Sequence, residues 1–227
     1  MSLMQFVVAV EPEDLTALNE VVDAGRKVER KWLKEAREEH GLAILRGRAL
    51  SEARSAVRAR FRRLREQGVL AGTRDLVVAR EVRAELARRG MDGEYEPVPA
   101  DAAGVPGRRV GTGPRHYQRA GDAPTTLTAR MAVRLPSGVG EQLVRACHWT
   151  SAPAVAALWE WQTRWGDGPE VIMREAQRRG AVTVLDVLCA GLAPRPDADS
   201  LLEKAQLQAQ VVTTGDIIRA AVKRAIR

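Results

Sequence analysis

The stretch that most constrains the fold is Thr128–Trp161, which begins with a segment of alternating polarity. Successive side chains of a β-strand point to opposite faces, so this segment is predicted to be a strand with one apolar face and one basic face. The apolar face would carry Met131, Val133 and Leu135, and the solvent face would carry Arg130, Ala132 and Arg134. A lone strand leaves its backbone N–H and C=O groups without partners. We therefore expect a second copy of the chain to supply the pairing strand, which predicts a homodimer or a higher homo-oligomer.

Two apolar helices are predicted after this strand. Pro136 has no N–H to donate, so it ends the strand, and a helix is expected over 137–147. A break is expected at His148–Ser151, because Thr150 and Ser151 are residue types that favour the N-cap position and Pro153 suits a first helical turn. The free N–H groups at a helix N-terminus bind anions. The start of this second helix is therefore a natural site for a DNA phosphate.

The order of these elements resembles the ribbon-helix-helix superfamily of the Arc and methionine repressors, over residues 127–162. In that superfamily an Arg–apolar–Pro step ends the strand, and here the step is Arg134–Pro136. The resemblance implies that the solvent face of the strand reads bases and that the start of the second helix binds phosphate: the base contacts would be Arg130, Ala132 and Arg134, and the phosphate contacts Thr150 and Ser151. The second helix departs from the family pattern, because it begins with Ala152–Ala154 rather than with charged residues. An ordinary strand-helix-helix piece of a larger fold is the alternative.

A second basic feature is a helix predicted over Ser51–Gln67. Its apolar residues share one helical face and are Leu50, Ala53, Val57, Phe61 and Leu64. The surrounding segment Ile44–Gly68 contains eight arginines and two glutamates, which gives it a net charge of +6. If this helix lies on a nucleic-acid backbone, its phosphate contacts are predicted to be Arg54, Arg58, Arg62 and Arg65. The alternative is a solvated basic face of a helical bundle.

The whole chain is predicted to be mainly α, in three parts. Residues 1–90 would form a basic helical domain, in which Glu13–Arg46 is one long helix or two, interrupted at Gly25 and Gly41. Residues 91–126 carry Gly and Pro at short intervals, so they are predicted to be a flexible linker. Residues 127–227 would hold the ribbon-helix-helix-like unit and further helices. The apolar start of the chain is expected to be a short strand or docking segment.

Signals for catalysis and metal binding are weak, so we expect no enzyme activity, no cofactor and no metal. The three histidines are scattered, and Cys147 and His148 are sequence neighbours that point about 100° apart on a helix. The Gly-rich segment Gly104–Gly113 lacks the Gly-Lys-Ser/Thr ending that grips phosphates. Two cysteines favour a reducing compartment, and the apolar start is too short to span a membrane. These features predict a cytoplasmic protein that does not contact membranes.

Charge then selects the class of partner. The net charge is +7 and the pI is about 10.1, which favours an anionic partner. We expect a sequence-specific DNA-binding protein, such as a repressor, a partition protein or a relaxosome accessory factor of a plasmid or other mobile element. The alternative is a non-catalytic structural or assembly subunit of a phage or other nucleoprotein complex.

Overall fold

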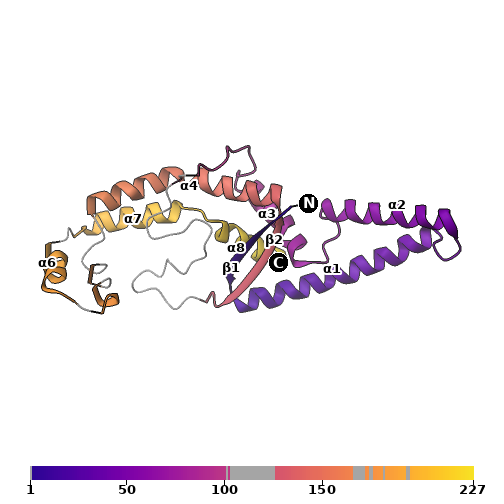
Figure 1. The fold of residues 1–227 in the computed structure, drawn as a ribbon, viewed down its shortest axis with the longest axis horizontal. Helices are drawn as coiled ribbons and strands as arrows, with labels where there is room; N and C mark the ends of the chain where they lie inside the picture. The colour runs from indigo at the N-terminus through magenta and orange to yellow at the C-terminus, as the bar shows by residue number, and fades with distance from the viewer. Residues whose placement is uncertain are drawn as a thin grey trace. The chain divides into compact units, whose positions relative to one another are not determined.

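The computed structural model describes residues 2–100, 102, 126–165, 172–173, 176–180, 182–192 and 195–227. These residues are mainly helical, with one two-stranded antiparallel sheet (Figure 1). They form two compact units: the first contains described residues from 2–94, 126–144 and 214–227, and the second those from 95–102 and 145–213. This division differs from the predicted boundaries at 90 and 127, because the strand after 128 and the last helix belong to the same unit as the N-terminal part of the chain. Most of the predicted linker 91–126 lies outside the described residues.

The sheet pairs two segments of the first unit that are far apart in the sequence. Strand β1 (Leu3–Val10) lies antiparallel to strand β2 (Ala129–Pro136), with Met4 opposite Leu135 and Val8 opposite Met131. The predicted strand is confirmed, and its apolar face is fully buried: Met131, Val133 and Leu135 are each 0% exposed. The pairing strand, however, comes from the same chain. The prediction that a second copy supplies the strand beside β2 is therefore wrong, because β1 already satisfies the backbone groups on that edge.

Helices α3 (Arg74–Arg88) and α8 (Thr214–Ala225) pack together beside the ribbon in the core of the first unit. Their fully or nearly fully buried apolar residues include Val77, Val78, Val82, Ile217, Ile218, Ala221 and Val222. Thr73 begins α3, since its side-chain oxygen accepts a hydrogen bond from the Leu76 amide. The apolar face of the last helix therefore closes this core.

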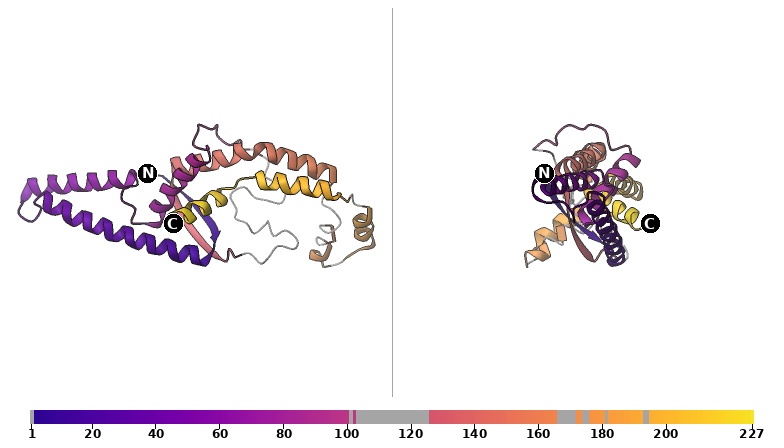
Figure 2. Two further views of the ribbon diagram at one scale, coloured as in Figure 1. Left: turned by 180° about the vertical axis from the view of Figure 1, so that it is seen from behind. Right: turned by 90° about the vertical axis from the view of Figure 1, so that its right-hand side faces the viewer.

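Helices α1 (Pro12–Glu39) and α2 (Gly47–Glu66) lie side by side and form an arm of the first unit (Figures 1 and 2). The predicted interruption at Gly25 is wrong, because α1 runs through it. A Cβ at Gly25 would lie 2.4 Å from the carbonyl oxygen of Ala71, so the glycine allows the chain after α2 to approach α1. Gly41 follows the end of α1 at a φ of +60°, as a residue after a helix often does.

Helix α4 spans Ser137–Trp165 without a break. The interruption predicted at His148–Ser151 is wrong, and so is the two-helix layout that depended on it. One buried stripe continues through the segment, with Leu143 and Cys147 before it and Ala154 and Leu158 after it. Packing along this stripe outweighs the loss of one backbone hydrogen bond at Pro153.

The second unit contains most of α4, together with α6 (Val184–Leu192) and α7 (Ala198–Gln210). Ala154 and Leu158 of α4 pack against Val211, which follows α7. The indole of Trp161 donates a hydrogen bond to the Ser200 carbonyl, at 2.9 Å. None of the helices in the described ranges has both the length and the apolarity needed to cross a bilayer.

Candidate nucleic-acid interface

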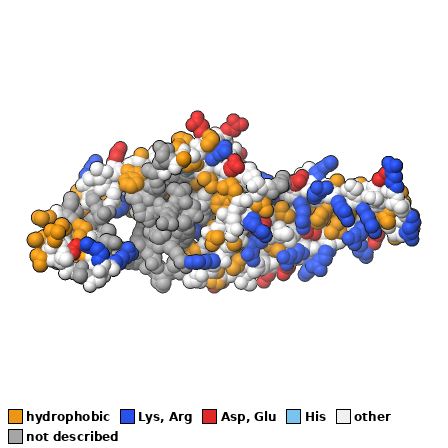
Figure 3. Space-filling view, in the orientation of Figure 1, with side chains coloured by type: hydrophobic (Ala, Val, Ile, Leu, Met, Phe, Trp, Pro, Cys, Tyr) orange, Lys and Arg blue, Asp and Glu red, His pale blue; other side chains and the backbone are white. Residues whose placement is uncertain are grey.

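The predicted basic helix corresponds to α2, and its apolar face is turned toward α1. Val57 is 4% exposed, and the ring centroid of Phe61 lies 5.6 Å from that of Trp32 on α1. Arg60 lies over the same Trp32 ring and pairs with Glu39 at 3.2 Å. This packing fixes which sides of α2 face solvent. Figure 3 shows Lys and Arg side chains spread along the arm.

A buried carboxylate holds the base of the arm together. Glu29 on α1 accepts two hydrogen bonds from Arg65 on α2, of 2.8 and 2.7 Å, and one of 2.9 Å from the Gly72 amide. Its side chain is 8% exposed, against 34% for Arg65. Burial alone would raise the pKa of Glu29, but the hydrogen bonds from Arg65 and Gly72 outweigh that effect and lower it below its usual value. The site therefore keeps Glu29 ionised and joins α1, α2 and the following loop.

Arg65 was expected to contact phosphate together with three other arginines of α2. Its guanidinium is instead engaged by Glu29 and lies 4.6 Å from the ring centroid of Phe61. A bidentate arginine–carboxylate pair fixes both side chains in one geometry. Arg65 thus has a structural role that the sequence-based prediction did not give it.

The other three predicted contacts form a row on one flank of α2. Arg54, Arg58 and Arg62 are exposed and follow one another at intervals of four residues, so they span about 12 Å along the helix. None of the carboxylates in the described part of the chain lies within 4.0 Å of them. We call these residues the arginine row. Arg63, on the opposite flank, is also exposed and without such a carboxylate, although it was not predicted as a contact.

The cations of α1 differ from this row because several have acidic neighbours. Lys31 pairs with Glu35 at 3.8 Å, and Lys34 with Glu38 at 4.0 Å, each one turn along the same helix. Such pairs reduce the local field that a polyanion would meet. The uncompensated positive charge of the arm is therefore concentrated on α2.

The residues predicted to read bases lie on the solvent face of the ribbon, but the face is less basic than expected. Arg130 is exposed, with no carboxylate within 4.0 Å among the residues described. Arg134 is engaged by Asp75, which accepts its backbone N–H at 3.0 Å and lies 3.4 Å from its Nε. The residues opposite Arg130, Ala132 and Arg134 on β1 are Ala9, Val7 and Gln5. Strand β1 therefore adds no arginine opposite these three residues, as a second copy of β2 would have done.

The two predicted phosphate contacts on α4 do not lie at a helix N-terminus. Thr150 is exposed in the middle of α4, and Ser151 is 4% exposed. The Ser151 hydroxyl donates to the Val212 carbonyl at 3.1 Å and accepts from the Val212 amide at 2.9 Å. The physical basis for a phosphate contact at these positions is thus absent, since the amide groups of a helix interior are already bonded to carbonyls.

Sequence reasoning missed Glu29, although a signal for it was present. Glu29 lies on the same stripe of α1 as the buried residues Val22 and Ala36, at a spacing of seven. A charged residue within a buried stripe requires a partner. Its partner Arg65 belongs to another helix, so the sequence does not indicate which arginine it is.

Comparison of the chain with models of protein families, with curated proteins and with solved structures found no match. The described residues contain no group of three or more His, Cys, Asp or Glu side chains placed to hold a metal ion. The features that bear on function are therefore the charge and geometry of the arm and the ribbon.

Proposed function

We propose that the protein binds duplex DNA and that α2 lies along the phosphate backbone. The observation that carries this proposal is the arginine row, in which Arg54, Arg58 and Arg62 are exposed, aligned on one flank and uncompensated by carboxylates of the described residues. Arginine forms strong hydrogen bonds to phosphate oxygens, and cations on one flank of a helix track a backbone. The net charge of +7 adds a favourable long-range attraction.

Contacts of this kind do not depend on base sequence. The geometry therefore supports binding along the backbone more strongly than base recognition, which suits a non-catalytic subunit of a nucleoprotein complex. A sequence-specific regulator or accessory factor, such as a repressor, a partition protein or a relaxosome factor, is the second candidate. Arg130 favours it, because this residue lies exposed on a ribbon, and a two-stranded ribbon fits the major groove, where arginine pairs with guanine.

The salt dependence of DNA binding tests the primary proposal. Fluorescence anisotropy with a random-sequence duplex would compare the natural protein with the triple variant Arg54→Gln, Arg58→Gln, Arg62→Gln. Each lost phosphate contact should flatten the slope of log affinity against log salt by about 0.9. Three contacts give about 2.7, so the ratio of natural to variant affinity should fall by about 40-fold between about 50 and 200 mM salt.

The matched control removes the same charge from the other helix of the arm. Lys27, Lys31 and Lys34 are exposed on the side of α1 away from its buried stripe, and all three would be replaced by Gln. This variant should keep most of the natural slope. If the arginine-row variant keeps the natural salt slope, α2 does not lie on the backbone. The same conclusion follows if the lysine control flattens the slope as much as the arginine-row variant does.

Random-site selection followed by Arg130→Gln separates the two candidates. Enrichment of one motif, lost in this variant while affinity for random duplex is retained, would establish the sequence-specific regulator. If the selection enriches no DNA motif, the non-catalytic subunit that binds the DNA backbone remains the supported function.

A further inference from the structure

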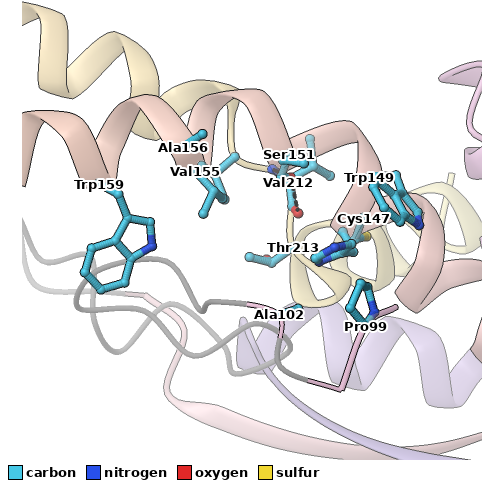
Figure 4. A pocket seen from close by; sticks show the side chains of 13 residues that line it. Pro99, Ala102, Cys147, Trp149, Ser151, Val155, Ala156, Trp159, Val212 and Thr213 are labelled. Carbon is cyan, nitrogen blue, oxygen red and sulfur yellow. Dashed lines mark hydrogen bonds between the residues drawn. The ribbon is translucent and has the colours of Figure 1, made fainter. Parts of the chain in front are cut away.

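The second unit contains a cavity of about 440 Å³ beside α4. Pro99 and Cys147 lie toward one end and Trp159 lies at the other, with Val155 between them (Figure 4). The rest of its wall includes the segment that joins α7 to α8, at Val211–Thr213. Its volume is within the usual range of small-molecule sites, about 300–1,000 Å³.

The wall of this cavity is largely apolar, and some of its polar groups already form hydrogen bonds within the protein. The Ser151 hydroxyl is bonded to both backbone groups of Val212, as described above. The indole N–H of Trp149 donates to the carbonyl of Glu96, at 2.9 Å. None of the described lining residues is Asp, Glu, Lys or Arg. A ligand with a full charge would lose hydration here without gaining an ionic partner.

The imidazole of His148 is a polar group of the wall that could bond to a ligand. His148 is half-buried, and its ring meets Trp149 edge-on, with centroids 5.0 Å apart at 82°. Neither of its ring nitrogens is hydrogen-bonded to a residue that the structure describes. The imidazole can therefore give or accept one hydrogen bond at the wall. The 43% exposed indole of Trp159 adds an aromatic surface at the far end.

We propose that this cavity binds an uncharged aromatic small molecule that carries one hydrogen-bonding group, such as a phenol. The apolar wall selects an uncharged ligand, the Trp159 indole favours a flat ring, and His148 takes the single polar group. The proposal does not depend on DNA binding by α2, because the cavity is lined by the second unit and the arginine row belongs to the first.

Isothermal titration calorimetry with 2-naphthol tests this proposal, using 2-naphthalenesulfonate as the matched anionic probe. We expect saturable one-to-one binding of 2-naphthol and at least a 10-fold weaker affinity for the sulfonate. His148→Phe keeps a ring in the wall but removes the hydrogen bond. It should weaken 2-naphthol binding by about 2- to 10-fold, the equivalent of one net hydrogen bond, and leave naphthalene binding unchanged.

Two further measurements locate the ligand. Ala156→Phe adds bulk at an exposed position of the wall and should abolish binding. In the natural protein, 2-naphthol should slow the alkylation of the buried Cys147 and leave the exposed Cys189 unaffected. No saturable binding, equal affinity for the sulfonate, or binding that neither protects Cys147 nor responds to Ala156→Phe would overturn the proposal.

Discussion

Replacing Arg65 by Gln should destabilise the protein, whereas the same replacement at Arg62 should not. Both residues are arginines of α2, but Arg65 donates two hydrogen bonds to the buried carboxylate of Glu29, whereas Arg62 is exposed and has no ionic partner among the described residues. Breaking a buried ion pair by removing one partner costs about 3–5 kcal/mol. Because the Arg65 side chain is 34% exposed, water offsets part of that loss. We therefore expect a loss of about 2–3 kcal/mol for Arg65→Gln, against less than about 0.5 kcal/mol for Arg62→Gln.

Urea unfolding followed by far-UV circular dichroism measures this difference, and its pH dependence tests the cause. The pKa of Glu29 is lowered in the folded protein, so its contribution to stability is present above the usual value of 4.5 and is lost as the pH falls below it. In Arg65→Gln that contribution is absent at neutral pH. The difference in unfolding free energy between the natural protein and Arg65→Gln should therefore decrease as the pH falls below 4.5.

The two variants should also separate in DNA binding. Under conditions in which both are folded, Arg62→Gln should flatten the salt slope by about 0.9, and Arg65→Gln should leave it unchanged. The reasoning about Glu29 would be refuted if Arg65→Gln unfolds at the same urea concentration as Arg62→Gln at neutral pH. It would also be refuted by a stability gap that stays constant in acid.

Two other predictions concern the stability of the first unit. The side chain of Glu85 is 3% exposed and accepts hydrogen bonds from two arginines, which lower its pKa from 4.5 to about 2. As the pH falls from 4.5 to about 2, the free energy of unfolding of the natural protein should therefore decrease by up to about 3 kcal/mol. The variant Glu85→Gln should lack this acid-dependent loss. Gly25→Ala should be destabilising in urea unfolding, although alanine favours a helix by about 1 kcal/mol, because the new Cβ would lie 2.4 Å from the Ala71 carbonyl oxygen. Gly138→Ala is the matched control, since nothing lies within 4 Å of the position of its new Cβ. If Gly138→Ala destabilises the protein as much as Gly25→Ala does, the steric explanation is wrong.

The sequence determined those features that depend on the spacing of nearby residues. Alternation over Arg130–Leu135 predicted β2 and its buried face, since side-chain direction in a strand has a period of two. The apolar spacing around Val57 similarly predicted α2 and left its arginines on the solvent side. For the candidate site, the pattern placed the three residues of the arginine row on one helix, but it grouped Arg65 with them.

Only the tertiary structure decided which distant residues meet. β1 pairs with β2 across more than a hundred residues, and no periodic pattern reveals such a partner. Packing along one buried stripe keeps α4 continuous where Thr150, Ser151 and Pro153 locally favour a break, because burial along a whole helix outweighs a local preference. Arg65 and Arg62 are both arginines in the same basic segment of the sequence, yet of the two only Arg65 contacts Glu29. A charge acquires a structural role only when folding brings its partner within hydrogen-bonding distance, and that information lies in the contacts between segments.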